Sequence, residues 1–280
     1  MISYIGGKNR MSSWIENCIP KDIENFVEVF GGMYWVFFKM DITKYPNLKK
    51  VIYNDFNPLN ANLFRCVGNH VLLLEACNKL PVQQKGITPT PPSYRELFNN
   101  IQSEIYNDSF TVSDEPDYDI AAKYAYVLTQ VFSGSNPTKS KFIDLKGKYH
   151  SKFTSFKNKL NDTKWQKLFE SITSIENMDF QDVIEKYDSS TTYFYCDPPY
   201  YRTENYYANH DFGIETHERL ANTLINMKGK FSLSYYHFDQ LETWFPRDRY
   251  RWESKDFHKA AAAKPGKSQT KGTELLIMNY

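Results

Sequence analysis

The chain has 280 residues, 41% of them hydrophobic and 16% aromatic, which is enough to build one large or two moderate domains. Its formal net charge of +1 favours no class of partner, because the distribution of charge matters more than the sum. Four cysteines without a CxxC or Cys/His cluster argue against a zinc site and a disulfide scaffold, so we expect no metal. The absence of a signal-like or membrane-spanning apolar run predicts no membrane association and a cytoplasmic location.

The first half of the chain changes from strands to helices. Apolar runs predict strands over 25–30 and 49–53, and residues 33–40 between them read as a buried helix. From Pro58 onward the spacing predicts helices over 60–80, 94–106 and 120–132.

Strands return in the second half of the chain. Short β-rich runs occupy residues 171–175, 192–196, 230–235, 250–254 and 274–279. Helical patterns separate several of them, at 179–187, 217–227 and 238–245; Thr216 is a candidate N-cap and Gly229 a candidate stop. This alternation predicts a mainly parallel α/β sheet, formed by residues 1–57 and 171–280, with a helical domain inserted at 58–170.

Two segments concentrate positive charge. Residues 136–160 contain seven lysines and one acid, and residues 247–272 contain eight Lys or Arg and three acids. Residues 104–119 have six acids and no base, which is typical of a solvated loop.

A glycine turn follows the first predicted strand. FVEVFGG (26–32) resembles the strand-to-helix turn at which doubly wound folds bind a cofactor, and Asp55 ends the second strand, where an acid commonly bonds a ribose. The continuation FGGMYW is not GxGxxG, so a nucleoside-like cofactor without a pyrophosphate fits better than a dinucleotide. The alternative is a turn that only packs strand against helix.

The stretch YCDPPYYRT (195–203) stops a buried strand with two prolines. An exocyclic amino group is a poor nucleophile because its lone pair is delocalised into the ring. The Asp197 carboxylate and the Pro198 carbonyl can accept its two hydrogens and expose that lone pair. Tyr200 would then stack on a base that has left the duplex. The alternative is a rigid turn.

These motifs together resemble the Dam-like (D12 class) DNA adenine-N6 methyltransferases. The matching stretches are SYIGGK (3–8), VEVFGG (27–32), YNDFN (53–57), NMDF (177–180), DPPY (197–200), FSLSYY (231–236) and TELLIMNY (273–280). The resemblance implies a Rossmann-like sheet that uses S-adenosylmethionine, with an inserted, mainly helical target-recognition domain.

The resemblance also implies roles for individual residues. The catalytic tetrad would be Asp197, Pro198, Pro199 and Tyr200, and the cofactor would contact Tyr4, Lys8, Phe30, Gly31, Gly32, Asp55, Asp179 and Asp197. Asp179 could instead be a helix N-cap, and Lys8 a solvated lysine. Many relatives read Phe-x-Gly-x-Gly, whereas this chain has Tyr34 at the last glycine; its side chain either narrows the cofactor pocket or points away.

The segment 132–153 interleaves lysines with aromatic residues. We expect a basic hairpin with Gly147 near its tip, which enters a DNA groove while lysines neutralise phosphates: Lys139, Lys141, Lys146, Lys148 and Lys152. A solvated basic loop is the alternative. A second basic loop, 259–272, could close on DNA or remain disordered.

The prediction is therefore a site-specific enzyme that methylates adenine N6 in double-stranded DNA after base flipping. A restriction partner, an epigenetic mark or phage self-protection would all use this catalyst, in a bacterial or phage source. The alternatives are the same chemistry on RNA or single strands, a non-catalytic DNA-binding relative, and a small-molecule methyltransferase.

Overall fold

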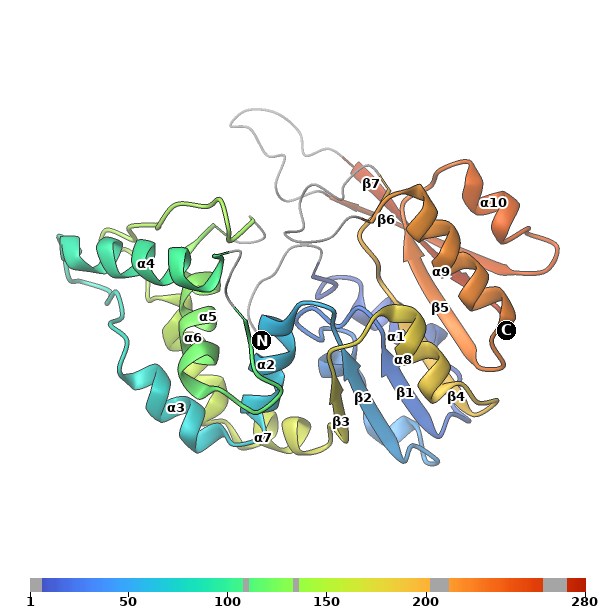
Figure 1. The fold of residues 1–280 in the computed structure, drawn as a ribbon, viewed down its shortest axis with the longest axis horizontal. Helices are drawn as coiled ribbons and strands as arrows, with labels where there is room; N and C mark the ends of the chain where they lie inside the picture. The colour runs from blue at the N-terminus through green and yellow to red at the C-terminus, as the bar shows by residue number, and fades with distance from the viewer. Residues whose placement is uncertain (1–6, 108–110, 133–135, 202–211, 259–270) are drawn as a thin grey trace. The chain divides into compact units, whose positions relative to one another are not determined.

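A single mixed sheet organises the strands of the structure. The computed structural model describes residues 7–107, 111–132, 136–201, 212–258 and 271–280 (Figure 1). Within these residues, seven strands follow the order β3-β2-β1-β4-β5-β7-β6. Their bounds are β1 Asn25–Glu28, β2 Lys50–Asn54, β3 Ser174–Glu176, β4 Thr192–Cys196, β5 Lys230–Tyr235, β6 Arg251–His258 and β7 Lys271–Met278.

The centre of the sheet is parallel and one side is antiparallel. β1 pairs in parallel with β2 and with β4, and β4 pairs in parallel with β5. β7 runs antiparallel to both β5 and β6. All five residues of β4 are buried, as expected for a parallel strand that is covered on both faces. The predicted α/β class is confirmed.

Helices flank the strands and fill the segment between β2 and β3. Their bounds are α1 Ser12–Cys18, α2 Pro58–Val67, α3 His70–Asn78, α4 Pro92–Ile105, α5 Tyr118–Gln130, α6 Lys152–Leu160, α7 Thr163–Glu170, α8 Phe180–Tyr187, α9 Ile214–Asn226 and α10 Gln240–Trp244. Several begin at an Asn, Asp or Ser whose side chain accepts a hydrogen bond from a first-turn backbone N–H, which satisfies an otherwise unpaired donor.

The prediction of a helix over residues 33–40 was wrong. The chain makes turns there and a short 3₁₀ helix, η1 (Phe37–Lys39), followed by η2 (Ile42–Lys44). The single helix expected over 60–80 is two helices, because Asn69 caps a new helix, α3, through its side chain. Helices α1, α6 and α7 were not predicted, and the N-cap of α9 is Gly213 instead of Thr216.

The chain forms two compact units. One contains Lys8 and residues 32–38 and 55–177; the other contains residues 9–31, 39–54 and 178–280. In the second unit, α8 and α9 lie side by side along the sheet (Figure 1). Their apolar faces pack in one core with strand side chains such as Val27, Phe194 and Leu233, so burial holds both helices against the sheet.

Tyr34 belongs to an aromatic cluster in the first unit. Its side chain is fully buried, its ring stacks on Phe37 at a centroid distance of 4.8 Å, and it meets Phe38 and Phe64 edge-on. Its backbone has φ of 55°, the left-handed region in which glycine is unstrained. The side chain thus packs among these rings, at the cost of backbone strain.

Tyr34→Gly should therefore destabilise the protein. Relief of left-handed strain returns about 1 kcal/mol. Removal of a buried aromatic side chain costs about 3 kcal/mol or more, so the loss dominates. Urea denaturation of Tyr34→Gly beside Tyr34→Phe, which keeps the ring, measures the difference. A glycine variant as stable as the wild type would show that the cluster contributes little.

Candidate active site

A buried amide fixes the end of β2 in the second unit. The Asn54 side chain is 1% exposed and donates hydrogen bonds to the carbonyl oxygens of Val29 (2.8 Å) and Met178 (3.1 Å). Its own oxygen accepts the backbone N–H of Met178 at 3.0 Å. This one side chain joins the chain that leaves β1 to the chain that enters α8.

The glycine turn depends on close backbone approach. A Cβ atom at Gly31 would lie 2.3 Å from the Tyr53 ring and 2.8 Å from the Asn54 carbonyl oxygen. The Gly31 N–H donates to that same carbonyl at 2.7 Å. Only glycine fits this contact, and Gly32 then takes φ of 48°. The turn is thus specified by packing as well as by conformation.

Asp55 holds the second half of the turn. One carboxylate oxygen accepts the Gly32 N–H at 2.7 Å and the Asn60 side-chain amide at 3.1 Å. The other accepts the Asn57 N–H at 2.8 Å. The residue is partly exposed, so its carboxyl group is accessible from solvent.

The predicted catalytic motif lies at the switch point of the sheet. From β1 the chain continues to β2 on one side, whereas β4 lies on the other, so the strand order reverses between β1 and β4. Open α/β sheets bind ligands outside the carboxyl ends of strands at such a point. Phe30 follows β1 there and Asp197 follows β4, and the two strands are in register at Glu28 and Tyr195.

The tetrad is compact and largely buried. Pro198, Pro199 and Tyr200 are buried, and Asp197 is partly exposed. The Tyr200 hydroxyl lies 2.9 Å from Asp197 Oδ1 and also contacts the Glu274 carboxylate. Burial, followed by the charges of Asp197 and Glu274, raises the pKa of Tyr200 well above its usual value, so its hydroxyl stays protonated.

The Tyr200 ring is only 7% exposed. It stacks on Tyr235 at a centroid distance of 5.5 Å and meets Tyr236 edge-on at 4.4 Å. Stacking of a base on Tyr200 stays a prediction, and it requires a neighbouring ring to move away.

Asp179 has two structural partners. It is the N-cap of α8, accepting the Gln181 N–H at 2.9 Å, and its two oxygens bind Arg219 of α9 at 2.6 and 2.8 Å. Desolvation raises the pKa of Asp179, but the hydrogen bonds from Arg219 and Gln181 and the Arg219 charge together lower it below its usual value. The Arg219 guanidinium also lies 4.0 Å from the Phe180 ring centre.

Three aromatic rings stand beside this ion pair. Phe30 is 5.8 Å from Phe180 and 5.9 Å from Phe212, measured between ring centroids. Phe30 remains partly exposed while the other two are buried. The end of β1 thus offers apolar ring surface close to the Asp179 carboxylate.

The remaining predicted cofactor residue with a described position is Lys8. It is buried in the first unit, with 8% of its surface exposed, so the solvated lysine considered from the sequence is not what the structure shows. Tyr4 lies outside the described residues.

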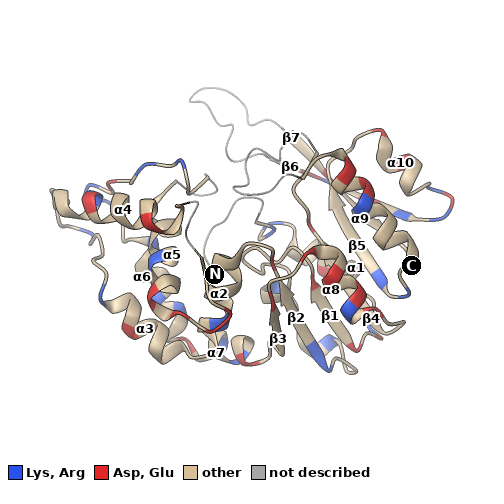
Figure 2. Ribbon diagram, viewed as in Figure 1, with Lys and Arg blue, Asp and Glu red and all other residues tan. Residues whose placement is uncertain are grey.

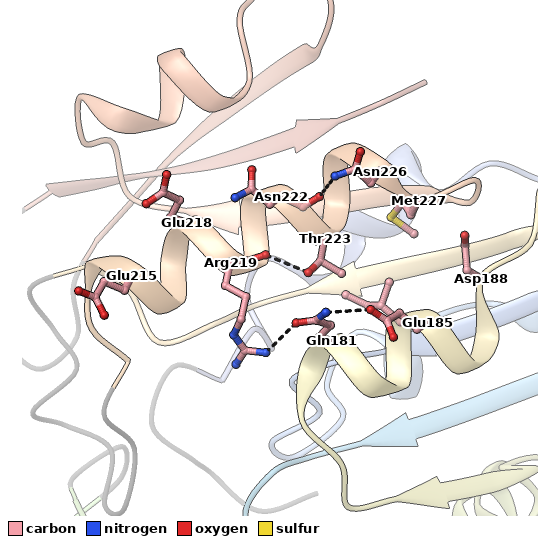
Figure 3. A pocket seen from close by; sticks show the side chains of 11 residues that line it. Gln181, Glu185, Asp188, Glu215, Glu218, Arg219, Asn222, Thr223, Asn226 and Met227 are labelled. Carbon is pink, nitrogen blue, oxygen red and sulfur yellow. Dashed lines mark hydrogen bonds between the residues drawn. The ribbon is translucent and has the colours of Figure 1, made fainter.

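A groove of about 520 Å³ lies between α8 and α9 (Figure 3). Four acids, Glu185, Asp188, Glu215 and Glu218, line it beside a single basic side chain, Arg219. None of the residues predicted for catalysis or cofactor binding lines this groove, so we do not place the chemistry there.

The five predicted DNA-contacting lysines are all exposed on the first unit. Figure 2 shows basic residues along the loop between α5 and α6. In place of a two-stranded ribbon, residues 136–150 form turns, with left-handed Lys146 and Gly147 at φ of 50° and 66°. Gln83 fastens the loop by donating to the Ile143 carbonyl at 2.8 Å and accepting from the Leu145 N–H at 2.8 Å.

Comparison with known proteins decides the family. The model of the D12 class N6 adenine-specific DNA methyltransferases matches residues 4–258. The chain belongs to this family. It is an enzyme that methylates adenine in DNA. It is 22% identical to the Type II methyltransferase M.CviBI of Paramecium bursaria Chlorella virus NC1A, over 285 residues that cover 100% of this chain and 99% of that protein.

Two functional candidates of this methyltransferase were missed from the sequence. Arg219 sits on an amphipathic helix, where an arginine is ordinary and gives no signal. Glu274 did give one, since it is an acid inside the apolar run TELLIM, but its partner could not be read from the sequence. In the part of the chain that the structure describes, no cluster of His, Cys, Asp or Glu could hold a metal ion, and no helix could cross a membrane.

Arg219→Met should raise the pKa of Asp179. The substitution removes both hydrogen bonds and the positive charge, while the desolvation that raises this pKa remains. NMR titration of the side-chain carboxyl carbon measures the shift, with Arg247→Met, which removes a surface partner of Glu242, as a control.

The lowered pKa of Asp179 determines how the contribution of this ion pair to folding stability changes with pH. The ion pair stabilises the wild type fully above the unfolded-state pKa of aspartate, and the effect disappears as the pH falls through the lower folded-state pKa. The stability difference between wild type and Arg219→Met should thus shrink on acidification. An unchanged Asp179 pKa in the variant would contradict this account.

Proposed function

We propose that the protein transfers a methyl group from S-adenosylmethionine to N6 of an adenine flipped out of double-stranded DNA, at a specific sequence. The observation that carries this proposal is the position of Asp197 and Phe30 at the switch point between β1 and β4. Membership of the family supports the reaction class, and the local geometry supports the roles of the residues.

The residues suit a nucleoside-like sulfonium cofactor. Phe30 offers partly exposed aromatic surface, and the carboxylates of Asp55 and Asp179 can accept hydrogen bonds from hydroxyl and amino groups. The crowded Gly31 turn lacks the GxGxxG spacing that a pyrophosphate needs. When bound, S-adenosylmethionine supplies an electrophilic methyl group.

The chain's own contribution is to activate the acceptor. The Asp197 carboxylate and the Pro198 carbonyl accept the two hydrogens of adenine N6, so the nitrogen lone pair points towards the methyl carbon. With the cofactor bound, N6 would form its new bond to the methyl carbon, and the electron pair of the broken carbon–sulfur bond would stay on sulfur. N6 then releases one proton to Asp197 or to water. The barrier falls mainly through positioning and electrostatics.

The loop between α5 and α6 supplies the DNA contact in this proposal. Its lysines can neutralise phosphates, and the exposed Tyr149 ring among them offers an apolar contact. Gln83 attaches the loop to the first unit, and its hydrogen bonds to Ile143 and Leu145 restrain the chain just before the turn at Lys146 and Gly147.

Asp197→Ala should abolish methylation and leave the fold intact, because the residue is partly exposed and lies after the strand. Single-molecule sequencing of plasmid from expressing cells detects N6-methyladenine directly. Glu218→Ala, an exposed acid of the α8–α9 groove, is the matched control. Methylation by Asp197→Ala at the wild-type level would remove Asp197 from the catalytic site.

Replacement of Lys146 and Lys148 with alanine should lower the salt dependence of DNA binding. Each lost phosphate contact reduces the slope of log K against log salt by about 1. Fluorescence anisotropy with duplex and single-stranded DNA of one sequence measures this slope, with the exposed Lys228→Ala before β5 as a control. An unchanged slope would place the DNA contact elsewhere, and tighter binding of the single strand would favour that substrate.

A further inference from the structure

Glu274 is a buried acid inside an apolar strand. It lies on β7, is 2% exposed, and is followed by the buried residues Leu275, Leu276, Ile277 and Met278. A buried carboxyl group is costly unless hydrogen bonds satisfy it. The side chain contacts the hydroxyl of Tyr200, 74 residues earlier in the chain. This contact joins β7 to the catalytic tetrad inside one compact unit.

The Tyr200 hydroxyl lies between two carboxyl groups. Asp197 Oδ1 is 2.9 Å away on one side, and Glu274 Oε1 is in contact on the other. A hydroxyl has one hydrogen to donate and two lone pairs with which to accept. The two carboxyl groups therefore share this one hydroxyl.

Burial makes this shared contact important for Glu274. Glu274 is almost fully buried, whereas Asp197 is partly exposed to solvent, and a buried polar group is costly unless a hydrogen bond satisfies it. The Tyr200 hydroxyl thus links the buried Glu274 side chain to the partly exposed Asp197 side chain. Titratable side chains beside this chain of groups include Tyr195 on β4, which bonds Ser234, Tyr235 on β5, and Tyr236.

We propose that Glu274 is a positioning residue of the methyltransferase, which acts through the Tyr200 hydroxyl to hold the Asp197 carboxylate in the orientation that accepts the adenine amino group. The proposal rests on the proposed role of Asp197. Tyr200 is itself held by ring contacts with Tyr235 and Tyr236, so the hydroxyl needs only one further anchor to be fixed. Small misplacements of a catalytic group cost rate more than they cost substrate binding.

A double-mutant cycle tests this inference. Glu274→Met keeps the length of the side chain and removes its hydrogen bond, and Tyr200→Phe removes the hydroxyl. Methylation of duplex DNA is measured at saturating S-adenosylmethionine for wild type, both single variants and the double variant. Thermal unfolding of each confirms the fold, and Glu274→Ala replaces the methionine variant should that one not fold.

We expect the effects of the two substitutions on kcat to be non-additive. Each single substitution lowers kcat by about tenfold, the effect of about one hydrogen bond. The KM for DNA stays within about twofold, and the double variant is no slower than Tyr200→Phe, because Glu274 influences the rate through that hydroxyl. Glu274→Gln, which keeps a hydrogen-bonding group on a side chain of the same length, recovers most of the lost rate. Glu253→Met on neighbouring β6 serves as the surface control.

Other outcomes overturn the inference. A wild-type kcat in Glu274→Met, or losses that multiply to about a hundredfold in the double variant, shows that Glu274 does not act through Tyr200. A glutamine variant as slow as the methionine variant overturns it as well. Asp197→Ala in the same assay separates the two hypotheses: if it is active, the site assignment fails. If it is inactive while the Glu274 variants match the wild type, only the positioning role fails.

Discussion

The buried Asn54 amide is the interaction on which the arrangement of the site depends. Its three hydrogen bonds reach the residue that leaves β1 and the residue that precedes the cap of α8. In the same place Gly31 packs against Tyr53 and the Asn54 carbonyl without room for a side chain. These contacts fix the positions of Val29 and Met178 relative to each other, although the two residues are distant in the chain. The positions of Phe30 and Asp179, the next residues along the chain, are thereby fixed as well.

The carboxylates proposed for cofactor binding already have partners within the protein. Asp55 accepts two backbone N–H groups and a side-chain amide, and Asp179 accepts a backbone N–H and a bidentate arginine. These bonds orient both groups before any ligand arrives, which is the role that preorganisation plays in binding. A cofactor would add to the Asp55 bonds, whereas at Asp179 it would compete with Arg219.

Tyr34 shows how a departure from a family motif is accommodated. The position requires a left-handed backbone, which explains why glycine suits it, yet here the side chain gains stacking and edge contacts in a buried aromatic cluster. The packing gain exceeds the backbone strain. The residue therefore stabilises the first unit, and the departure from glycine does not by itself argue against catalysis.

The sequence by itself determined the features that depend on neighbouring residues. Apolar runs, glycines and prolines located β1, β2, β4 and β5, the turn at Gly31 and the DPPY stop, because these signals act over a few residues. The resemblance supplied the family, which the comparison confirmed. Short helices such as α6 and α7 were missed because their patterns are brief. The turn near Gly147 was predicted and is held by the local bond from the Lys146 N–H to Asp144, but the attachment of the loop to Gln83, about sixty residues away, was not.

Only the tertiary structure decided which distant groups meet. It set the strand order that brings Phe30 and Asp197 to one switch point, and it paired Asp179 with Arg219 across 40 residues and Tyr200 with Glu274 across 74. The buried ring of Tyr34 is a third example. Such contacts depend on how helices and strands pack, and a single sequence carries no local signal for a partner that the chain reaches only after folding.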